Sequence, residues 1–176
     1  MEKLNKLFWD FISLFGTLGA GLLVVILGFI LDIQLGLHLL IDLVVITAVS
    51  NTIKYFYFKP RPDNPEGIRP TIDFHVLDVR KYLSFRHGLK NIWHAFEHVD
   101  AGSFPSIHSA RSMNQAILLA VFLTGIPCAQ TALIAFAAIV GWSRWVKRRH
   151  FKFDIATGFV LGSLIAALSL WISPLL

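Results

Sequence analysis

The sequence predicts an all-α membrane protein, a helix bundle with about five transmembrane helices and an amphipathic helix at the membrane surface. Of its 176 residues, 55% are apolar and 15% are charged, whereas a soluble domain carries about 25% charge. The mean hydropathy is +0.63, and the basic residues lie between long apolar runs. The net charge of +5 therefore suits anionic headgroups or phosphates and not nucleic acid. At this length we expect one domain, residues 1–176, whose chemistry lies on the helices and their connections.

Two apolar runs of 21 residues open the chain. Residues 11–31 carry no charge, and about 20 apolar residues cross a bilayer core of roughly 30 Å. We expect a spanning helix there and not a secretory signal, because the apolar stretch is long for a signal and no small-residue cleavage site follows it. Residues 33–53 predict the second span. Its two polar residues, His38 and Asp42, predict a polar contact inside the bundle.

The connection from residue 59 to residue 105 has a different character, with 13 charged residues among 47 and four prolines near its start. We expect it to lie outside the membrane. Within it, apolar residues recur at helical spacing over residues 89–99 beside charged ones, which predicts an amphipathic helix. This helix either lies in the membrane interface or packs on the domain, and the pattern does not separate the two.

The next apolar stretch contains no charge for 32 residues, from 112 to 143. As one helix it would be about 48 Å long, which is too much for one upright span. A Gly-Ile-Pro sequence ending at Pro127 provides a break. We therefore expect a third span over residues 106–124 and a fourth over residues 128–146.

A fifth uncharged run covers residues 155–176. Gly158 and Gly162 within it have the four-residue spacing that allows close helix contact. Five spans in alternation place the ends of the second and fourth helices, and the starts of the third and fifth, on one side of the membrane. The connections on the opposite side carry no lysine or arginine, so the positive-inside tendency favours a cytoplasmic position for the basic side.

Cationic side chains converge at that shared side. Lys54 ends the second span, Arg61 follows seven residues later, and Arg144 ends the fourth span. Three cations around one point predict an oxyanion with more than one negative charge, because arginine grips two oxygens and lysine acts as a point charge. Ser106 opens the third helix, where a hydroxyl and the first backbone amides favour an anion. Taken singly, each of these residues is better explained as a headgroup-binding or snorkelling side chain.

Two histidines and a carboxylate complete the group. His150 and Asp154 are four residues apart at the start of the last helix, so we expect them within hydrogen-bonding reach. A carboxylate on one ring nitrogen fixes the tautomer and leaves the other nitrogen to act as a nucleophile. His108, near the start of the third helix, is placed to protonate a leaving oxygen and later to take a proton from water.

These residues form three ordered motifs, Lys54-x6-Arg61-Pro62, Pro105-Ser106-Ile107-His108 and Ser143-Arg144-x5-His150-x3-Asp154. In residue type, order and spacing they resemble the motifs of the type 2 phosphatidic acid phosphatase family, whose site is shared with vanadium haloperoxidases. The resemblance spans residues 54–154, and its one departure is Ile107, where the family usually has glycine.

The resemblance implies a metal-independent lipid phosphatase without a cofactor. In it His150 becomes phosphorylated, Asp154 orients His150, and His108 protonates the leaving oxygen. The residues that would hold the phosphoryl oxygens are Lys54, Arg61, Ser106 and Arg144. The predicted spans exclude a soluble haloperoxidase.

Two other function classes compete with this one. The segment His94-Ala95-Phe96-Glu97-His98 matches the HxxEH pattern of inverted zinc peptidases. Such a site needs a third protein ligand, typically a downstream glutamate, and Glu97 is the last glutamate in the chain. A non-catalytic transporter or scaffold is disfavoured because all seven catalytic positions are present. We expect a lipid phosphate substrate within the bilayer, and neither nucleic acid nor an obligate protein partner.

The motifs do not specify the lipid. Phosphatidic acid, phosphatidylglycerol phosphate, an isoprenoid diphosphate and lipid A 1-phosphate all fit a phosphate cradle that opens towards lipid. The basic residues of the long connection favour a headgroup with additional negative charge, such as lipid A or a diphosphate. Bacterial members of the family commonly act on the outer side of the inner (plasma) membrane, and catalytic cations inflate the charge bias. We therefore expect the site to face outward, although the bias alone favours the cytoplasm.

Overall fold

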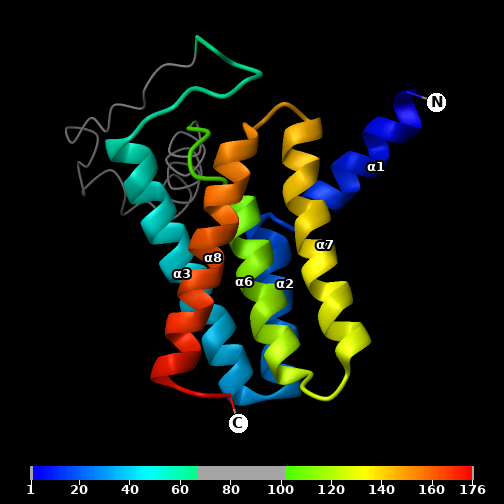
Figure 1. Ribbon diagram of the computed structural model, residues 1–176, viewed down its shortest axis with the longest axis vertical. Coiled ribbons are helices and arrows are strands. Elements are labelled where there is room, and N and C mark those ends of the chain that lie inside the picture. Colours follow the sequence, from blue (N-terminus) through cyan, green and yellow to red (C-terminus); the bar gives the residue numbers. More distant parts are fainter. Residues whose placement is uncertain (1, 67–101, 176) are drawn as a thin grey trace, which may run out of the picture.

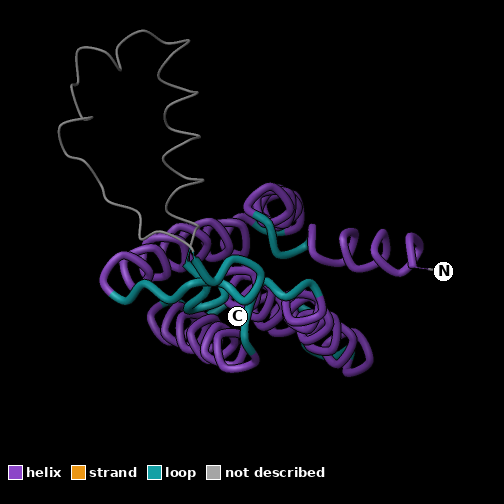
Figure 2. Tube along the Cα trace, turned by 90° about the horizontal axis from the view of Figure 1, so that it is seen from above, coloured by secondary structure: helices purple, strands orange, loops and turns teal. Residues whose placement is uncertain are grey.

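The computed structural model describes residues 2–66 and 102–175, which form six α-helices and no strand (Figure 1). The helices are α1 (Glu2–Leu14), α2 (Leu18–Leu31), α3 (Ile33–Phe56), α6 (Ile107–Phe122), α7 (Pro127–Val146) and α8 (Lys152–Ile172). Five of them stand side by side, whereas α1 runs outward to the N-terminus (Figure 2). The predicted all-α bundle is therefore confirmed.

Helix α6 is the central element, because it packs against α2, α3, α7 and α8. Helix α8 approaches it closely through two glycines. A Cβ atom on Gly162 would lie 2.2 Å from the carbonyl oxygen of Ala110, and one on Gly158 would lie 2.4 Å from that of Ser106. The close contact predicted from the glycine spacing is confirmed, and it brings the start of α6 against the start of α8.

The expected first span, residues 11–31, is not one helix. The chain turns after Leu14, and α2 begins anew at Leu18 with Thr17 as its N-cap, whose hydroxyl accepts from the backbone N–H of Ala20 at 3.3 Å. The axes of α1 and α2 differ by 50°. Glycine followed by an N-cap threonine favours such a restart, so the prediction of an uninterrupted helix is wrong.

Of the described helices, α3 and α8 are long and apolar enough to cross a membrane, and the bent pair of α1 and α2 would add a third span. The third and fourth expected spans correspond to α6 and α7, which do not meet this criterion. Helix α6 has only 16 residues, and it buries polar side chains at the centre of the bundle, among them Arg111, Asn114 and Gln115. The helical membrane bundle is thus confirmed with fewer clear spans than the five expected.

The polar residues of α3 make the internal contacts that their position predicted. The Nδ1 atom of His38 lies 2.7 Å from the hydroxyl of Ser169, and Asn114 Nδ2 donates to a carboxylate oxygen of Asp42 at 2.7 Å. These contacts join α3 to α8 and to α6. The segments expected to hold an amphipathic helix, residues 89–99, and the HxxEH pattern, residues 94–98, lie outside the described residues.

Candidate active site

Four helix ends carry the predicted site residues to one end of the bundle. Lys54 lies in the last turn of α3 and Arg144 in the last turn of α7, whereas Ser106 is the N-cap of α6. His150 lies in the connection between α7 and α8. These ends all lie at the upper end of the bundle in Figure 1, so the helix ends that we expected on one side of the membrane lie at one end of the bundle.

The connection from α7 to α8 is a Schellman turn that returns the chain to Arg144. The backbone N–H of Arg148 donates to the carbonyl of Trp145 at 2.9 Å, and that of Arg149 donates to the carbonyl of Arg144 at 3.0 Å. Arg148 is left-handed, with φ of 54°, at the position where this motif usually has glycine. The N–H of His150 also donates to the Arg144 carbonyl, at 3.3 Å. The five-residue spacing between Arg144 and His150 in the third motif therefore corresponds to a single turn that reverses the chain.

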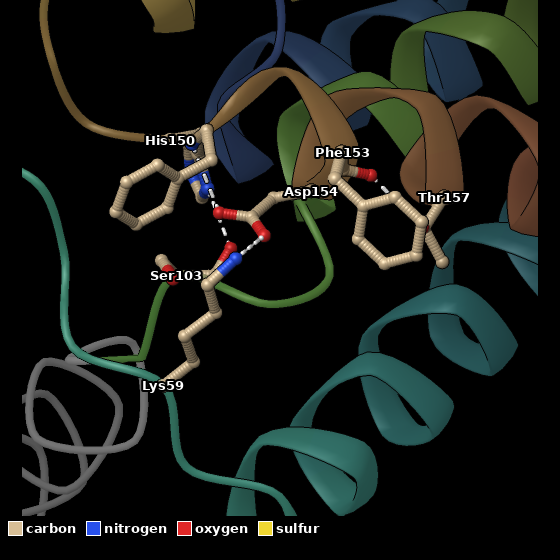
Figure 3. Close-up of polar contacts among 7 residues, drawn as sticks. Lys59, Ser103, His150, Phe153, Asp154 and Thr157 are labelled. Carbon is tan, nitrogen blue, oxygen red and sulfur yellow. Dashed lines mark hydrogen bonds and ion pairs between the residues drawn. The ribbon is translucent and has the colours of Figure 1, made fainter.

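The imidazole of His150 is buried and held at one nitrogen. Its Nδ1 atom lies 2.6 Å from the carbonyl oxygen of Ser103 (Figure 3). A carbonyl oxygen only accepts, so Nδ1 carries the proton and the lone pair of the neutral ring is on Nε2. The side chain is 1% exposed. His150 thus has the tautomer that a nucleophilic Nε2 requires.

Burial is the main cause that lowers the pKa of His150 to about 3, followed by the positive charges of Arg144 and Lys54. The hydrogen bond to Ser103 opposes this shift, and Arg61 adds to it. All three predicted phosphate-binding cations therefore act on the same imidazole. Since Lys54 and Arg144 are themselves 2% and 6% exposed, the site concentrates positive charge around a neutral histidine, an arrangement that favours a multiply charged oxyanion.

Asp154 has different partners from those that its spacing predicted. Its carboxylate accepts from Lys59 Nζ at 2.6 Å (Figure 3). It also accepts from the backbone N–H of Phe151 at 2.9 Å. The nitrogen of His150 that we expected it to hold is instead bound to Ser103. The reason is that α8 begins at Lys152, so His150 precedes the helix and the four-residue helical spacing does not apply to it.

The start of α6 is joined to the start of α8. The backbone N–H of Ser106 donates to the carbonyl of Asp154 at 3.0 Å, and the Ser106 hydroxyl accepts from the hydroxyl of Ser109 at 2.9 Å. Ile107, the departure from the family motif, is 5% exposed and packs with Ile46 and Ala110 in the core. Its side chain therefore serves the packing of α6 on α3.

His108 is the second residue of α6 and lies against the turn between α1 and α2. A Cβ atom on Gly16 would lie 2.7 Å from the Cβ and Cδ2 atoms of His108.

A cavity of about 350 Å³ opens beside His150. It is lined by Pro62, Trp145, Arg148, His150, Phe151 and Lys152. In the described part of the chain, no group of three or more His, Cys, Asp or Glu side chains could hold a metal ion.

Three residues at the site were not anticipated from the sequence. Lys59 lies inside the variable part of the first motif, five residues after Lys54, and its only signal is its positive charge. Ser103 acts through its carbonyl, which every residue type supplies. Ser13, whose hydroxyl accepts from Arg144 at 2.6 Å, lies within an apolar run that we expected to form one continuous helix.

Residues 35–175 match the profile of the PAP2 superfamily. This range covers most of the chain and contains every predicted catalytic and phosphate-binding residue. The chain belongs to the PAP2 superfamily. Membership supports phosphatase activity on phosphate esters, which is a hydrolase activity. Comparison with curated proteins and with solved structures gives no significant match.

Proposed function

We propose that this PAP2 protein is a metal-independent lipid phosphatase that works through a phosphohistidine at His150. The observation that carries the proposal is the neutral, buried imidazole of His150 with Nδ1 held by the Ser103 carbonyl and with three cations acting on it. A neutral Nε2 attacks, and surrounding cations stabilise the charge that develops on the phosphoryl oxygens. Arg144, Lys54, Arg61 and Ser106 are the groups to which we assign that stabilisation.

The reaction takes two steps. In the first, His150 Nε2 attacks phosphorus, the bond from phosphorus to the lipid oxygen breaks, and His108 donates a proton to the departing oxygen. In the second, His108 takes a proton from a water molecule while the water oxygen attacks phosphorus, and the bond from phosphorus to His150 Nε2 breaks. Orthophosphate leaves, and both histidines return to their starting states. We assign Asp154 a positioning role, because it fixes the start of α8 next to His150.

The substrate we propose is a lipid phosphate, because the site lies at the end of a membrane bundle whose helices expose large apolar side chains, among them Phe153, Val160 and Trp171. The cavity beside His150 carries Arg148 and Lys152, which favours a headgroup with extra negative charge. Lipid A 1-phosphate and a diphosphate fit this preference, and phosphatidylglycerol phosphate is the alternative.

The test is phosphate release by the purified protein in detergent with a chelator, using phosphatidic acid, phosphatidylglycerol phosphate, an isoprenoid diphosphate and lipid A side by side. We expect activity that the chelator leaves unchanged and that His150→Ala abolishes, together with a phosphohistidine trapped after quenching at alkaline pH. Arg149→Gln is the control variant, because Arg149 pairs with Asp63 at 3.1 Å and has no role in the proposed chemistry. A requirement for added zinc, or turnover by a folded His150→Ala variant, would overturn the proposal.

We also propose that the site faces the outside of the inner membrane. The native Cys128 is exposed at the start of α7, the opposite end from the site. Asn64 is exposed near the site end. A membrane-impermeant thiol reagent on intact cells should label Asn64→Cys in a Cys128→Ser background and leave native Cys128 unlabelled. The reverse pattern would place the site in the cytoplasm.

A further inference from the structure

The turn between α1 and α2 reaches the candidate active site, although an uninterrupted helix was expected there. Arg144 Nη1 donates to the hydroxyl of Ser13 at 2.6 Å, and Gly16 lies against the ring of His108. Both contacts come from residues that precede residue 35, where the family match begins. This N-terminal segment therefore adds contacts to a site whose motifs lie elsewhere.

We propose that residues 13–17 are a positioning element of the active site. Ser13 orients the guanidinium of Arg144 towards the phosphoryl oxygens, and Gly16 provides the space that holds His108 as general acid. The proposal rests on the proposed function for the roles of Arg144 and His108. The contacts themselves are features of this chain.

The Ser13 contact is buried on both sides, with Ser13 4% and Arg144 6% exposed. Hydrogen bonds from a charged donor are stronger than neutral ones, and because the guanidinium is planar, holding one terminal nitrogen restricts the whole group. Packing of the turn on α7 does not require a hydroxyl, because Phe15 of the turn meets Phe136 of α7 edge to face with ring centroids 5.0 Å apart. The serine thus adds orientation to a contact that apolar side chains already provide.

Gly16 acts by lacking a side chain. A Cβ atom there would lie 2.7 to 2.9 Å from three atoms of His108, closer than real Cβ atoms approach, so any other residue would displace the imidazole or the turn. Gly19, three residues on, has nothing within 4 Å of the corresponding position. The two glycines therefore form a matched pair for testing whether the space at His108 matters.

The turn is fixed to the two helices that carry its targets. Lys147, just after α7, pairs with Asp10 of α1 at 2.8 Å, and Gln115 of α6 donates to the carbonyl of Gly21 in α2 at 3.4 Å. Arg144 is on α7 and His108 is on α6. An element attached to both helices can hold the two residues in register with each other.

The first test uses orthovanadate, a phosphate mimic, with binding followed by tryptophan fluorescence of the full-length protein. Ser13→Ala should weaken vanadate binding about tenfold, the loss expected when one hydrogen bond to a charged group is removed. Ser13→Thr, which keeps the hydroxyl, should recover most of it. Equal vanadate affinity in wild type and Ser13→Ala would overturn the role of Ser13.

The second test compares Gly16→Ala with Gly19→Ala in single-turnover hydrolysis of a lipid phosphomonoester and of p-nitrophenyl phosphate. A displaced general acid slows departure of an alkoxide more than that of a phenolate. Gly16→Ala should therefore lose at least about tenfold more rate on the lipid than on p-nitrophenyl phosphate, and Gly19→Ala should change neither. Equal losses for both substrates in Gly16→Ala would assign Gly16 to packing alone.

The two proposals fail separately. If the wild-type protein releases phosphate from none of the four lipids named above, the proposed function is wrong, and the vanadate comparison still decides whether Ser13 orients Arg144. If the wild-type protein is active, but Ser13→Ala binds vanadate as the wild type does and Gly16→Ala behaves as Gly19→Ala does, the proposed phosphatase activity stands and the proposed positioning role of residues 13–17 is wrong.

Discussion

Lys59 Nζ lies 2.6 Å from the carboxylate of Asp154, which is fully buried, whereas Lys59 is 30% exposed. The ammonium also lies 4.3 Å from the centre of the Phe151 ring, a cation–π distance. Lys59 belongs to the segment after α3, and Asp154 belongs to the first turn of α8. This pair therefore ties the segment that carries Arg61 to the start of the helix beside His150.

Lys59→Met should lower the free energy of unfolding by about 1–2 kcal/mol, because it leaves the buried Asp154 carboxylate without this cation. The figure is smaller than for a fully buried ion pair because Lys59 is partly exposed. Thermal unfolding in detergent measures the loss. The control is Lys147→Met, whose partner Asp10 is 48% exposed and whose removal should change stability much less, because solvent screens an exposed ion pair. Equal losses in the two variants would contradict a special role for the Lys59–Asp154 pair.

His150 should stay neutral at pH values where an ordinary histidine is protonated. Its pKa is lowered to about 3, so at about pH 5 the folded protein holds the uncharged ring while the unfolded chain binds a proton. The contribution of His150 to the free energy of unfolding is therefore fully present above about pH 6.5 and is lost as the pH falls towards 3. Spectra of ¹⁵N-labelled histidine, assigned with His150→Asn, should show a protonated Nδ1 and a bare Nε2 at about pH 5. Titration of His150 near 6.5 would refute its burial among cations.

Arg148→Gly should raise the free energy of unfolding by about 1 kcal/mol. Arg148 has a φ of 54°. This left-handed conformation costs about 1 kcal/mol for a residue with a Cβ atom, whereas glycine adopts it without that steric cost. Thermal unfolding of the variant against wild type checks the gain. Arg149→Gly, at the next position of the same turn, should be destabilising instead, because it loses the ion pair with Asp63 without relieving a left-handed residue.

Gly162→Ala should destabilise the bundle by several kcal/mol, since its Cβ would lie 2.2 Å from the Ala110 carbonyl oxygen and would force α6 and α8 apart. Gly19→Ala has open space at its Cβ and should gain up to about 1 kcal/mol from helix propensity. Unfolding temperatures of the two variants, measured in the same detergent, should therefore move in opposite directions. A stable Gly162→Ala variant would show that the helix pair tolerates separation.

The sequence predicted the parts of the fold that depend on hydrophobic runs and on alternation. The shared end for Lys54, Ser106 and Arg144 follows from counting crossings, and the contact of α8 with α6 follows from the spacing of two glycines. The break after Leu14 did not follow, because Gly16 and Thr17 interrupt the apolar run with neither a charge nor a proline. A helix restart inside such a run depends on capping and on what the turn packs against.

The site was predicted at the side chains that the three motifs contain, and it was missed at the Ser103 carbonyl and at two side chains that the motifs do not specify, Lys59 and Ser13. The cations around His150 could be named from residue type and spacing. The partner of His150 Nδ1 could not, because the carbonyl of Ser103 has no sequence signature and comes from a segment 47 residues earlier. The expected pairing of His150 with Asp154 assumed a helix that begins before His150, and α8 begins at Lys152.

The last prediction concerns His108, whose importance should depend on the leaving group. Protonation helps most when the departing oxygen is a poor leaving group, such as the alkoxide of glycerol or a sugar, and least for p-nitrophenolate, which is stable without a proton. His108→Ala should therefore lose about 100-fold or more of the first-step rate on a lipid phosphomonoester and much less on p-nitrophenyl phosphate. Steady-state rates would hide this difference if dephosphorylation is slow, because His108 also activates the water. Single-turnover measurement isolates the first step, and equal losses for both substrates would mean that His108 binds phosphate instead of donating a proton.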